Sequence, residues 1–270
     1  RSYSEAVSGN KYPYNYEMTT LENGTVVLVF DSSSHGVSGG SGQDIIIKHF
    51  NSSQSVLKSE FLAHSNSSGY QYQPAITALS DGGYALAWYG GTGNKIWYRS
   101  YDASGNGRFT EVELDLEGSN YYNPDIAELS NGNLVVVYHT SGKGTDSSGN
   151  GVFGQVIRAD GSRVGETFQV NIEYTQNAQQ NIQVVSLSGG KFMVAWESQN
   201  EDTSGYGLYG KVYDTEQGST SEKVRLNQYV NNHQDRVRIE SPNGRDVVGV
   251  WNSNSQDTSS LGVYMNVWST

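Results

Sequence analysis

The chain has 270 residues, of which 17% are charged and 35% hydrophobic, and it contains 32 glycines, 4 prolines and 19 tyrosines. This composition is typical of a turn-rich β protein and excludes a helical bundle or a disordered chain. The net charge of −11 argues against nucleic acid and anionic membranes as partners, and no apolar run is long enough to span a membrane. There is no cysteine, which excludes disulfides, thiol catalysis and cysteine-bound zinc.

A Leu-x-Asn/Asp-Gly turn recurs along the chain, and each copy precedes an apolar segment that ends in an aromatic residue. The copies begin at Leu21, Leu79, Leu129 and Leu187, with a looser one at Pro242-Asn243-Gly244. The aromatic residues are Phe30, Trp88, Tyr138, Trp196 and Trp251, 50 to 58 residues apart. Asn-Gly and Asp-Gly accept positive φ and predict hairpins. A fixed period of this size indicates stacked supersecondary units.

Each repeat is predicted to contain four short strands. First strands are expected at 14–21, 74–79, 124–129, 182–187 and 237–241. The most apolar, second strands are expected at 26–30, 84–88, 134–138, 192–196 and 247–251. Third strands follow Gly/Ser/Asp-rich loops at 45–50, 96–101, 152–157, 208–213 and 263–268. The fourth strands carry the recurring glutamates Glu60, Glu111, Glu166 and Glu222. The aromatic column is expected to form the core between neighbouring units.

The fifth repeat stops after its third strand, and the missing strand has a counterpart at the N-terminus. Ser4-Glu5-Ala6-Val7 aligns with Ser221-Glu222-Lys223-Val224. The sequence therefore predicts an all-β fold: a single five-bladed β-propeller of four-stranded blades, closed by the N-terminal strand completing the last blade. The expected blades of this single domain, 1–270, are 14–66, 73–117, 123–173, 181–229 and 235–270 with 1–9.

The repeat resembles the tandem repeats of secreted and surface adhesin-like proteins, both bacterial ones associated with RTX repeats and those of ciliates. It is clearest in residues 129–171, from the turn through Asp146-Ser147-Ser148-Gly149 to Val170-Asn171, and again in 187–227. The five-blade count is similar to that of tachylectin-type lectins. The resemblance implies an extracellular or cell-surface location and a non-enzymatic role, and it brings no catalytic residues with it.

The first functional hypothesis is a non-enzymatic extracellular recognition or adhesion module whose partners are glycans or other surface proteins. Tyrosines lie in the connections between blades, on the face expected to carry the Asp-rich loops, and aromatic rings with neighbouring amides suit sugar binding. Rim packing is the structural alternative for the tyrosines. The predicted ligand-binding residues are Tyr70, Tyr72, Tyr121, Tyr122, Tyr174, Asp146, Asp202 and Asp257.

No cofactor or metal is predicted, although the Asp-rich loops leave Ca²⁺ open as an alternative. Each loop offers one carboxylate, whereas a calcium site needs six to eight oxygens, so a structural turn is favoured. The histidines His35, His49, His64, His139 and His233 have no metal-binding spacing.

Two other functions stay open. A structural subunit of an extracellular filament or coat would self-assemble by exchange of the N-terminal strand, with residues 9–13 as the hinge. A propeller-type glycosidase would need two inner carboxylates, and Glu17 and Asp125 share one repeat position, with Arg236 or Arg238 near it in the fifth repeat.

Three Asn-x-Ser/Thr sequons lie in predicted turns, at Asn23, Asn51 and Asn66. They are expected to carry glycans if the source is eukaryotic and secretory. The chain begins at Arg1 without a hydrophobic leader, so a secreted protein would have lost its signal peptide.

Overall fold

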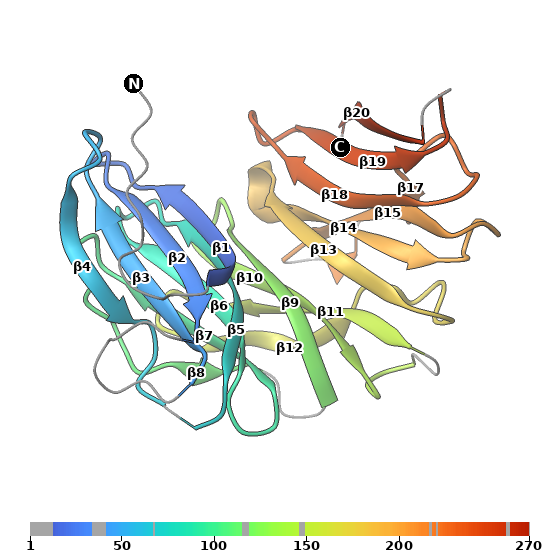
Figure 1. The fold of residues 1–270 in the computed structure, drawn as a ribbon. Helices are drawn as coiled ribbons and strands as arrows, with labels where there is room; N and C mark the ends of the chain where they lie inside the picture. Colours follow the sequence, from blue (N-terminus) through green and yellow to red (C-terminus); the bar gives the residue numbers. More distant parts are fainter. Residues whose placement is uncertain are drawn as a thin grey trace. The chain divides into compact units, whose positions relative to one another are not determined.

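The computed structural model describes residues 13–33, 42–66, 68–114, 119–145, 149–215, 218–219, 221–257 and 260–269. Over these residues the chain forms five antiparallel sheets, and its one 3₁₀ turn is Ser188–Gly190 (Figure 1). The all-β prediction is confirmed, and the five sheets fit five blades. The described residues include no helix that is both long and apolar enough to cross a membrane.

The sheets follow one another along the chain, each beginning with its first strand at one edge. The first sheet contains β1 (Pro13–Thr20), β2 (Val26–Ser32), β3 (Asp44–Phe50) and β4 (Val56–Leu62). The second contains β5 (Gln71–Ala78), β6 (Tyr84–Gly90), β7 (Lys95–Tyr101) and β8 (Val112–Glu113). The third contains β9 (Ser119–Glu128), β10 (Leu134–Ser141), β11 (Asn150–Ile157) and β12 (Arg163–Gln169).

The last two sheets depart from the four-stranded pattern. The fourth contains β13 (Gln179–Ser186), β14 (Lys191–Gln199) and β15 (Tyr206–Asp214), with two short strands paired to β15, β16 (Gly218–Ser219) and β17 (Val224–Arg225). The fifth contains β18 (Gln234–Glu240), β19 (Asp246–Asn254) and β20 (Leu261–Ser269). The predicted closing strand Ser4–Val7 lies outside the described residues.

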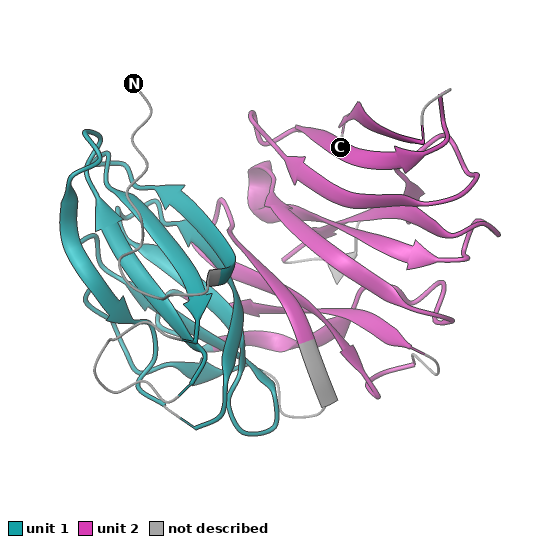
Figure 2. Ribbon diagram, viewed as in Figure 1, with its two compact units in different colours: residues 1–116, 159–162 teal, residues 117–158, 163–270 magenta. Residues whose placement is uncertain are grey.

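The chain divides into two compact units (Figure 2). Unit 1 comprises residues 1–116 with 159–162 and holds the first and second sheets. Unit 2 comprises residues 117–158 and 163–270 and holds the third, fourth and fifth sheets.

Unit 1 has its core between its two sheets. Val27 and Val29 of β2 pack with Ile45 and Ile47 of β3 in the cluster that also contains Trp88 of β6. The predicted hairpin turn joins β5 to β6. In this turn the Gly82 amide donates to the Leu79 carbonyl, and Gly82 has a φ of +88°.

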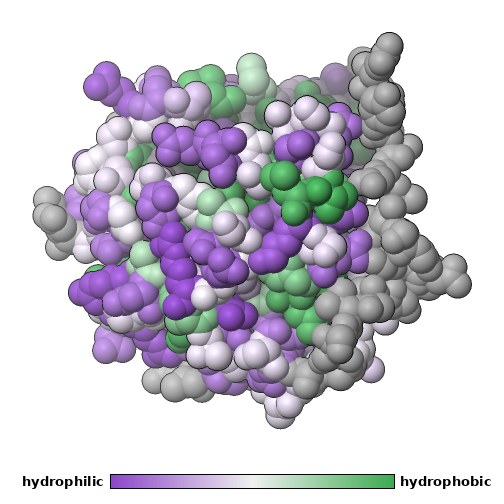
Figure 3. Space-filling model, turned by 90° about the vertical axis from the view of Figure 1, so that its left-hand side faces the viewer, coloured by the Kyte–Doolittle hydropathy of each residue, from purple (hydrophilic) through white to green (hydrophobic). Residues whose placement is uncertain are grey.

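The face drawn in Figure 3 is mostly hydrophilic, with apolar residues in separate patches.

The described residues of unit 2 form two core clusters, one on each side of the fourth sheet. Val194 and Trp196 of β14 pack toward Val135 and Val137 of β10. The alternate residues of the same strand, Met193 and Ala195, belong to a second cluster with Val237, Val247 and Trp251 of the fifth sheet. β14 is thus apolar on both faces, as a strand between two neighbours must be. All five aromatic residues of the repeat column are at most 5% exposed, which confirms their predicted place in the core.

The first strand of every sheet is interrupted at the same place. The pairing with the second strand shifts register there, for example between Tyr72 and Ala75 and between Asp235 and Arg238. In four of the five first strands, a residue at the interruption has positive φ: Gln73 (49°), Asn123 (46°), Asn181 (49°) and Arg236 (57°). These are β-bulges, which bend a strand and redirect its side chains and occur often beside active sites.

Candidate active site on the first strands of unit 2

The first strands β9, β13 and β18 of unit 2 are neighbours, and each carries a polar residue two positions after its bulge (Figure 1). These residues are Asp125, Gln183 and Arg238. The residues just after two of them, Ile126 and Ile239, are buried at 4% and 6% exposure. Because strand residues alternate between faces, the bulge leaves three polar side chains on the opposite face.

Asp125 is the carboxylate most suited to acid chemistry at this position. Its Oδ1 accepts the amide of Ile126 at 2.9 Å, and its Oδ2 accepts the amide of Val184 on β13 at 2.7 Å. Burial raises the pKa of Asp125 to about 6, against the lowering effect of these two hydrogen bonds and of Arg238, while Glu240 raises it further. The side chain is nonetheless partly exposed. The carboxyl is therefore mostly protonated below about pH 6, at a place that a ligand can reach.

Strand β18 supplies the charged side chains around Asp125. Arg236, Arg238 and Glu240 are exposed, and Val237 and Ile239 between them are buried. The Arg238 guanidinium donates to the Val237 carbonyl at 3.0 Å. The carboxyl of Asp125 can thus act as a general acid, and the guanidinium groups of Arg236 and Arg238 can bind anions.

A buried carboxylate holds the bulges in place. Glu197, fully buried at the end of β14, accepts the amide of Arg236 at the bulge of β18. It also accepts the side-chain amides of Asn181 at 2.8 Å and Gln180 at 3.3 Å, at the bulge of β13. Burial raises the pKa of Glu197, and these hydrogen bonds oppose the rise. Glu197 is out of reach of a ligand and acts as a positioning residue.

Unit 1 repeats this arrangement with Asp31, the residue that follows the aromatic Phe30. Asp31 Oδ2 accepts the amide of Gln73 at the next sheet's bulge, at 2.8 Å, and the side-chain amide of Asn15 at 2.7 Å. Sequence reasoning missed both Asp31 and Glu197. The signal that could have revealed them is the polar or aromatic residue after each repeat aromatic: Asp31, Tyr89, His139, Glu197 and Asn252.

The two carboxylates predicted for a glycosidase lie in different units. Glu17, exposed on β1 in unit 1, accepts the amide of Ile76 at 3.2 Å. Asp125 in unit 2 makes the equivalent contact to Val184. Both therefore link a first strand to the next one in their own unit, as their shared repeat position predicts.

The predicted sugar-binding tyrosines have varied surroundings. Tyr70 is 57% exposed and lies beside Tyr72, with ring centroids 6.0 Å apart, and Tyr72 stacks on Tyr89 at 5.1 Å. Tyr122 lies 5.5 Å from the His139 ring. Tyr174 is half-buried, and its hydroxyl accepts the Asn177 side-chain amide at 2.9 Å. The side chain of Tyr121 lies outside the described part of the chain.

The aspartates of the loops fold back over the strand that follows. Asp202 lies against Gly207, where a Cβ would come within 2.7 Å of its Oδ2, and Asp257 lies against Gly262 and bonds the Tyr264 hydroxyl. Asp146 is outside the described residues. In the part of the chain that is described, no three His, Cys, Asp or Glu side chains are grouped to hold a metal ion.

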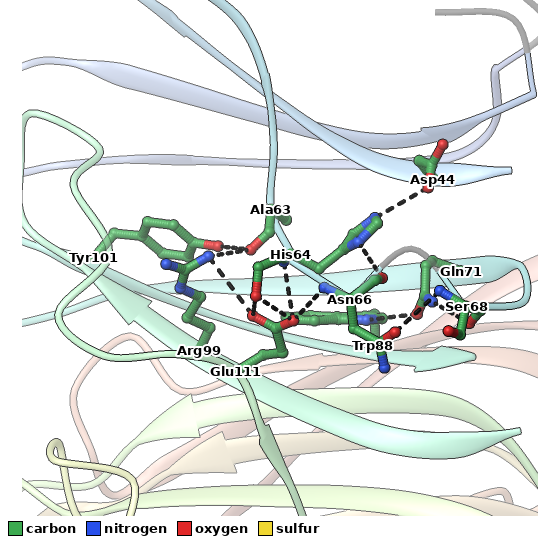
Figure 4. Close-up of polar contacts among 11 residues, drawn as sticks. Asp44, Ala63, His64, Asn66, Ser68, Gln71, Trp88, Arg99, Tyr101 and Glu111 are labelled. Atoms are coloured by element: carbon green, nitrogen blue, oxygen red, sulfur yellow. Dashed lines mark hydrogen bonds and ion pairs between the residues drawn. The ribbon is translucent and has the colours of Figure 1, made fainter. Parts of the chain in front are cut away.

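A second polar network, in unit 1, fixes the connection between β4 and β5 (Figure 4). His64 Nδ1 donates to the Asn66 carbonyl at 2.8 Å, and its Nε2 lies 3.3 Å from Asp44. The repeat glutamate Glu111 accepts the amides of Ser65 and Asn66 at 2.9 and 2.6 Å. Because His64 and Asp44 are buried, this network stabilises the connection and offers no open site.

A cavity of about 530 Å³ lies at the other ends of the strands of unit 2. Its lining includes the apolar side chains of Met193, Val212 and Trp268 and the turn residues Ser188 and Gly244. None of the polar first-strand residues lines it. The candidate site on the first strands therefore lies outside this cavity.

No family model and no curated protein matches the sequence. Solved structures do share the fold. The α-L-arabinanase of Penicillium chrysogenum, solved with arabinobiose, matches with a TM-score of 0.65 and 14% identity, over 94% of this chain and 77% of its own. The endo-arabinase of Bacteroides thetaiotaomicron matches with a TM-score of 0.57 and 14% identity, over 97% and 96%. The chain has a β-propeller fold. The α-L-arabinofuranosidase of Fusarium graminearum matches with a TM-score of 0.62 and 12% identity, over 94% and 82%.

These comparisons correct the functional prediction. Four of the matching structures are a family-43 glycoside hydrolase, two arabinanases and an arabinofuranosidase, and this finding contradicts the hypothesis of a non-enzymatic recognition module. The error came from the repeat motif, which describes the scaffold, whereas function depends on the residues that the scaffold presents. The comparisons give no support to assembly into a filament, nor to the resemblance to adhesin-like proteins or tachylectins.

Proposed function

We propose that the protein is a β-propeller glycoside hydrolase with Asp125 as its general acid. The observation that carries the proposal is the Asp125 carboxyl, which is partly exposed on β9, is oriented by two backbone amides and has a pKa of about 6. Glycoside hydrolysis requires a carboxylic acid that is still protonated at working pH to protonate the departing sugar oxygen. The similarity to arabinanases and an arabinofuranosidase supports the same reaction class.

Glu240 is our candidate for the second carboxylate. It is exposed on β18, and its charge acts on Asp125. As an ionised carboxylate it would either activate a water molecule or attack the anomeric carbon, while Asp125 protonates the oxygen of the breaking bond. Water supplies the hydrogen and hydroxyl that the two products gain. The charge of Arg238 lowers the pKa of Asp125, against the effect of burial.

The test is hydrolysis of aryl α-L-arabinofuranosides and arabino-oligosaccharides, the sugars named for the matching structures. We expect Asp125→Asn to lower kcat/KM about 10²- to 10⁴-fold, since that is the usual contribution of a general acid. Activity should fall as pH rises through about 6, because the acid loses its proton there. Glu166→Gln, at an exposed outer-strand glutamate, is the control and should keep full activity. Equal rates for wild type and Asp125→Asn would disprove the role of Asp125.

We further propose that the five sheets form one ring closed by the N-terminal segment Ser4–Val7. Support comes from the fifth sheet, which has three strands over the described residues, and from β20, whose Val263, Met265 and Val267 are 51% to 76% exposed. A fourth strand beside β20 would satisfy its edge, as the sequence alignment of that segment predicts.

The extracellular location and the glycans also remain proposals. In each sequon the asparagine Oδ1 accepts the amide two residues on, at 2.9 Å for Asn23, 3.0 Å for Asn51 and 3.0 Å for Asn66. This turn leaves the nitrogen of each side chain for attachment of a sugar, and Asn23 is the most exposed of the three. Ca²⁺ binding by the Asp-rich loops has no support beyond their composition.

A further inference from the structure

Two arginines of β18 are exposed and take part in none of the ion pairs of the described residues. Arg236 and Arg238 differ in this from Arg99, Arg108 and Lys211, each of which pairs with a carboxylate. The chain has 28 acidic residues against 17 basic ones, so carboxylate partners are abundant. Because neither guanidinium group pairs with a carboxylate of the described residues, both are available to bind an external anion.

The backbone at Arg236 has a conformation that arginine does not favour. Arg236 occupies the bulge of β18 with φ 57°, a conformation that costs a non-glycine residue about 1 kcal/mol or more. The equivalent bulges carry Gln73, Asn123 and Asn181. Asparagine tolerates this region best, because its short amide bonds locally, and arginine has no such advantage. Glu197 nevertheless anchors the Arg236 amide and so fixes the bulge.

Of the two arginines, Arg238 acts on the candidate catalytic acid. Arg238 occupies the same repeat position as Asp125 and Gln183, and its charge lowers the pKa of Asp125 without forming an ion pair with it. The other charged residues of β18 are Asp235 and Glu240. Neither of them is ion-paired with the two guanidinium groups among the described residues.

We propose that Arg236 and Arg238 bind the carboxylate of an acidic sugar, so that the substrate is a uronic-acid-containing oligosaccharide. A planar guanidinium fork matches a carboxylate with two parallel hydrogen bonds, which a neutral sugar cannot offer. The inference rests on the proposed function, because it places the acidic sugar unit next to the bond that Asp125 would cleave. It also distinguishes this protein from a hydrolase that takes neutral arabinose units alone.

The test is calorimetric titration of the Asp125→Asn variant, which separates binding from turnover. The ligands are trigalacturonate and a glucuronic acid-containing tetrasaccharide, with arabinotriose as the neutral control, at low and high salt. We expect at least one acidic ligand to bind about tenfold or more tightly than arabinotriose, and less so at high salt. Arg238→Gln should remove most of this preference, and Arg238→Lys should recover only part of it, because lysine keeps the charge without the fork.

Arg245→Gln, a charge removal in the turn between β18 and β19, is the matched control and should keep the preference. Thermal melting identifies any variant that has lost its fold. Equal affinity for acidic and neutral ligands, or an acidic preference that survives Arg238→Gln, would overturn the inference. Acidic binding without hydrolysis of any substrate by wild type would refute the proposed function and leave the acidic site standing. If wild type hydrolyses neutral arabinan through Asp125 and shows no preference for acidic ligands, the proposed function stands and the acidic site is refuted.

Discussion

At the residue scale, buried histidines make the stability of this protein depend on pH. His139 is 5% exposed, and burial lowers its pKa to about 4. His49, which shares a hydrogen bond with the Tyr84 hydroxyl at 3.0 Å, also has a pKa lowered to about 4, through burial and the nearby Lys58. Both side chains must therefore stay neutral in the folded chain, whereas the unfolded chain binds a proton at each below about pH 6.5.

We expect the contribution of His139 to be fully present above about pH 6.5 and to be lost as pH falls toward 4. The depressed pKa corresponds to about 3 kcal/mol over that interval. Urea unfolding of wild type and of His139→Gln at pH 7 and pH 4.5 measures this, because the variant has no proton to bind and should show a flatter profile. The exposed His233 is the control residue, and His233→Gln should keep the wild-type slope. A His139→Gln profile as steep as that of wild type would contradict the expectation.

At the element scale, the bulges of the first strands depend on carboxylates from neighbouring strands. Glu197 satisfies the bulge of β18 and the amides beside the bulge of β13, and Asp31 does the same for β1 and β5. The bulge residues place Asp125 and Arg238 on the same face. The carboxylates therefore serve both the stability of the strands and the geometry of the candidate site.

Replacing Glu197 with alanine should cost about 3–5 kcal/mol, because three partly buried donors lose their acceptor at once. Glu197→Gln keeps one oxygen and should be less destabilising. In the folded fraction, either variant should also weaken Arg236-dependent ligand binding, because the bulge is no longer fixed. Thermal unfolding and ligand titration report the two effects. A melting temperature for Glu197→Ala within one degree of wild type would show that the bulges do not need this carboxylate.

At the scale of the whole molecule, the proposed ring of five sheets needs a strand that closes it. Over the described residues β20 is an edge strand of the fifth sheet, and the segment proposed to pair with it is Ser4–Val7. We expect deletion of residues 1–9 to lower the melting temperature by several degrees and to increase self-association through the exposed edge. Ala6→Pro in the full chain should act in the same direction, because proline removes one ladder hydrogen bond.

Differential scanning calorimetry and size-exclusion chromatography measure these two effects. Ser2→Pro, before the predicted strand, serves as the control. If the deleted chain melts and elutes as wild type does, the N-terminal segment does not close the ring.

Sequence by itself determined the repeating framework. The Leu-x-Asn/Asp-Gly turns and the aromatic column predicted hairpins and a core that the structure contains, because turn geometry and burial depend on local residue type and period. The bulges escaped detection, since φ values near 50° at Gln73 and Arg236 leave no clear mark in a polar segment. The roles of Glu197 and Asp125 also depend on amides of neighbouring sheets, such as Arg236 and Val184. Such contacts join residues about 40 to 60 positions apart, and only the tertiary structure brings them within hydrogen-bonding distance.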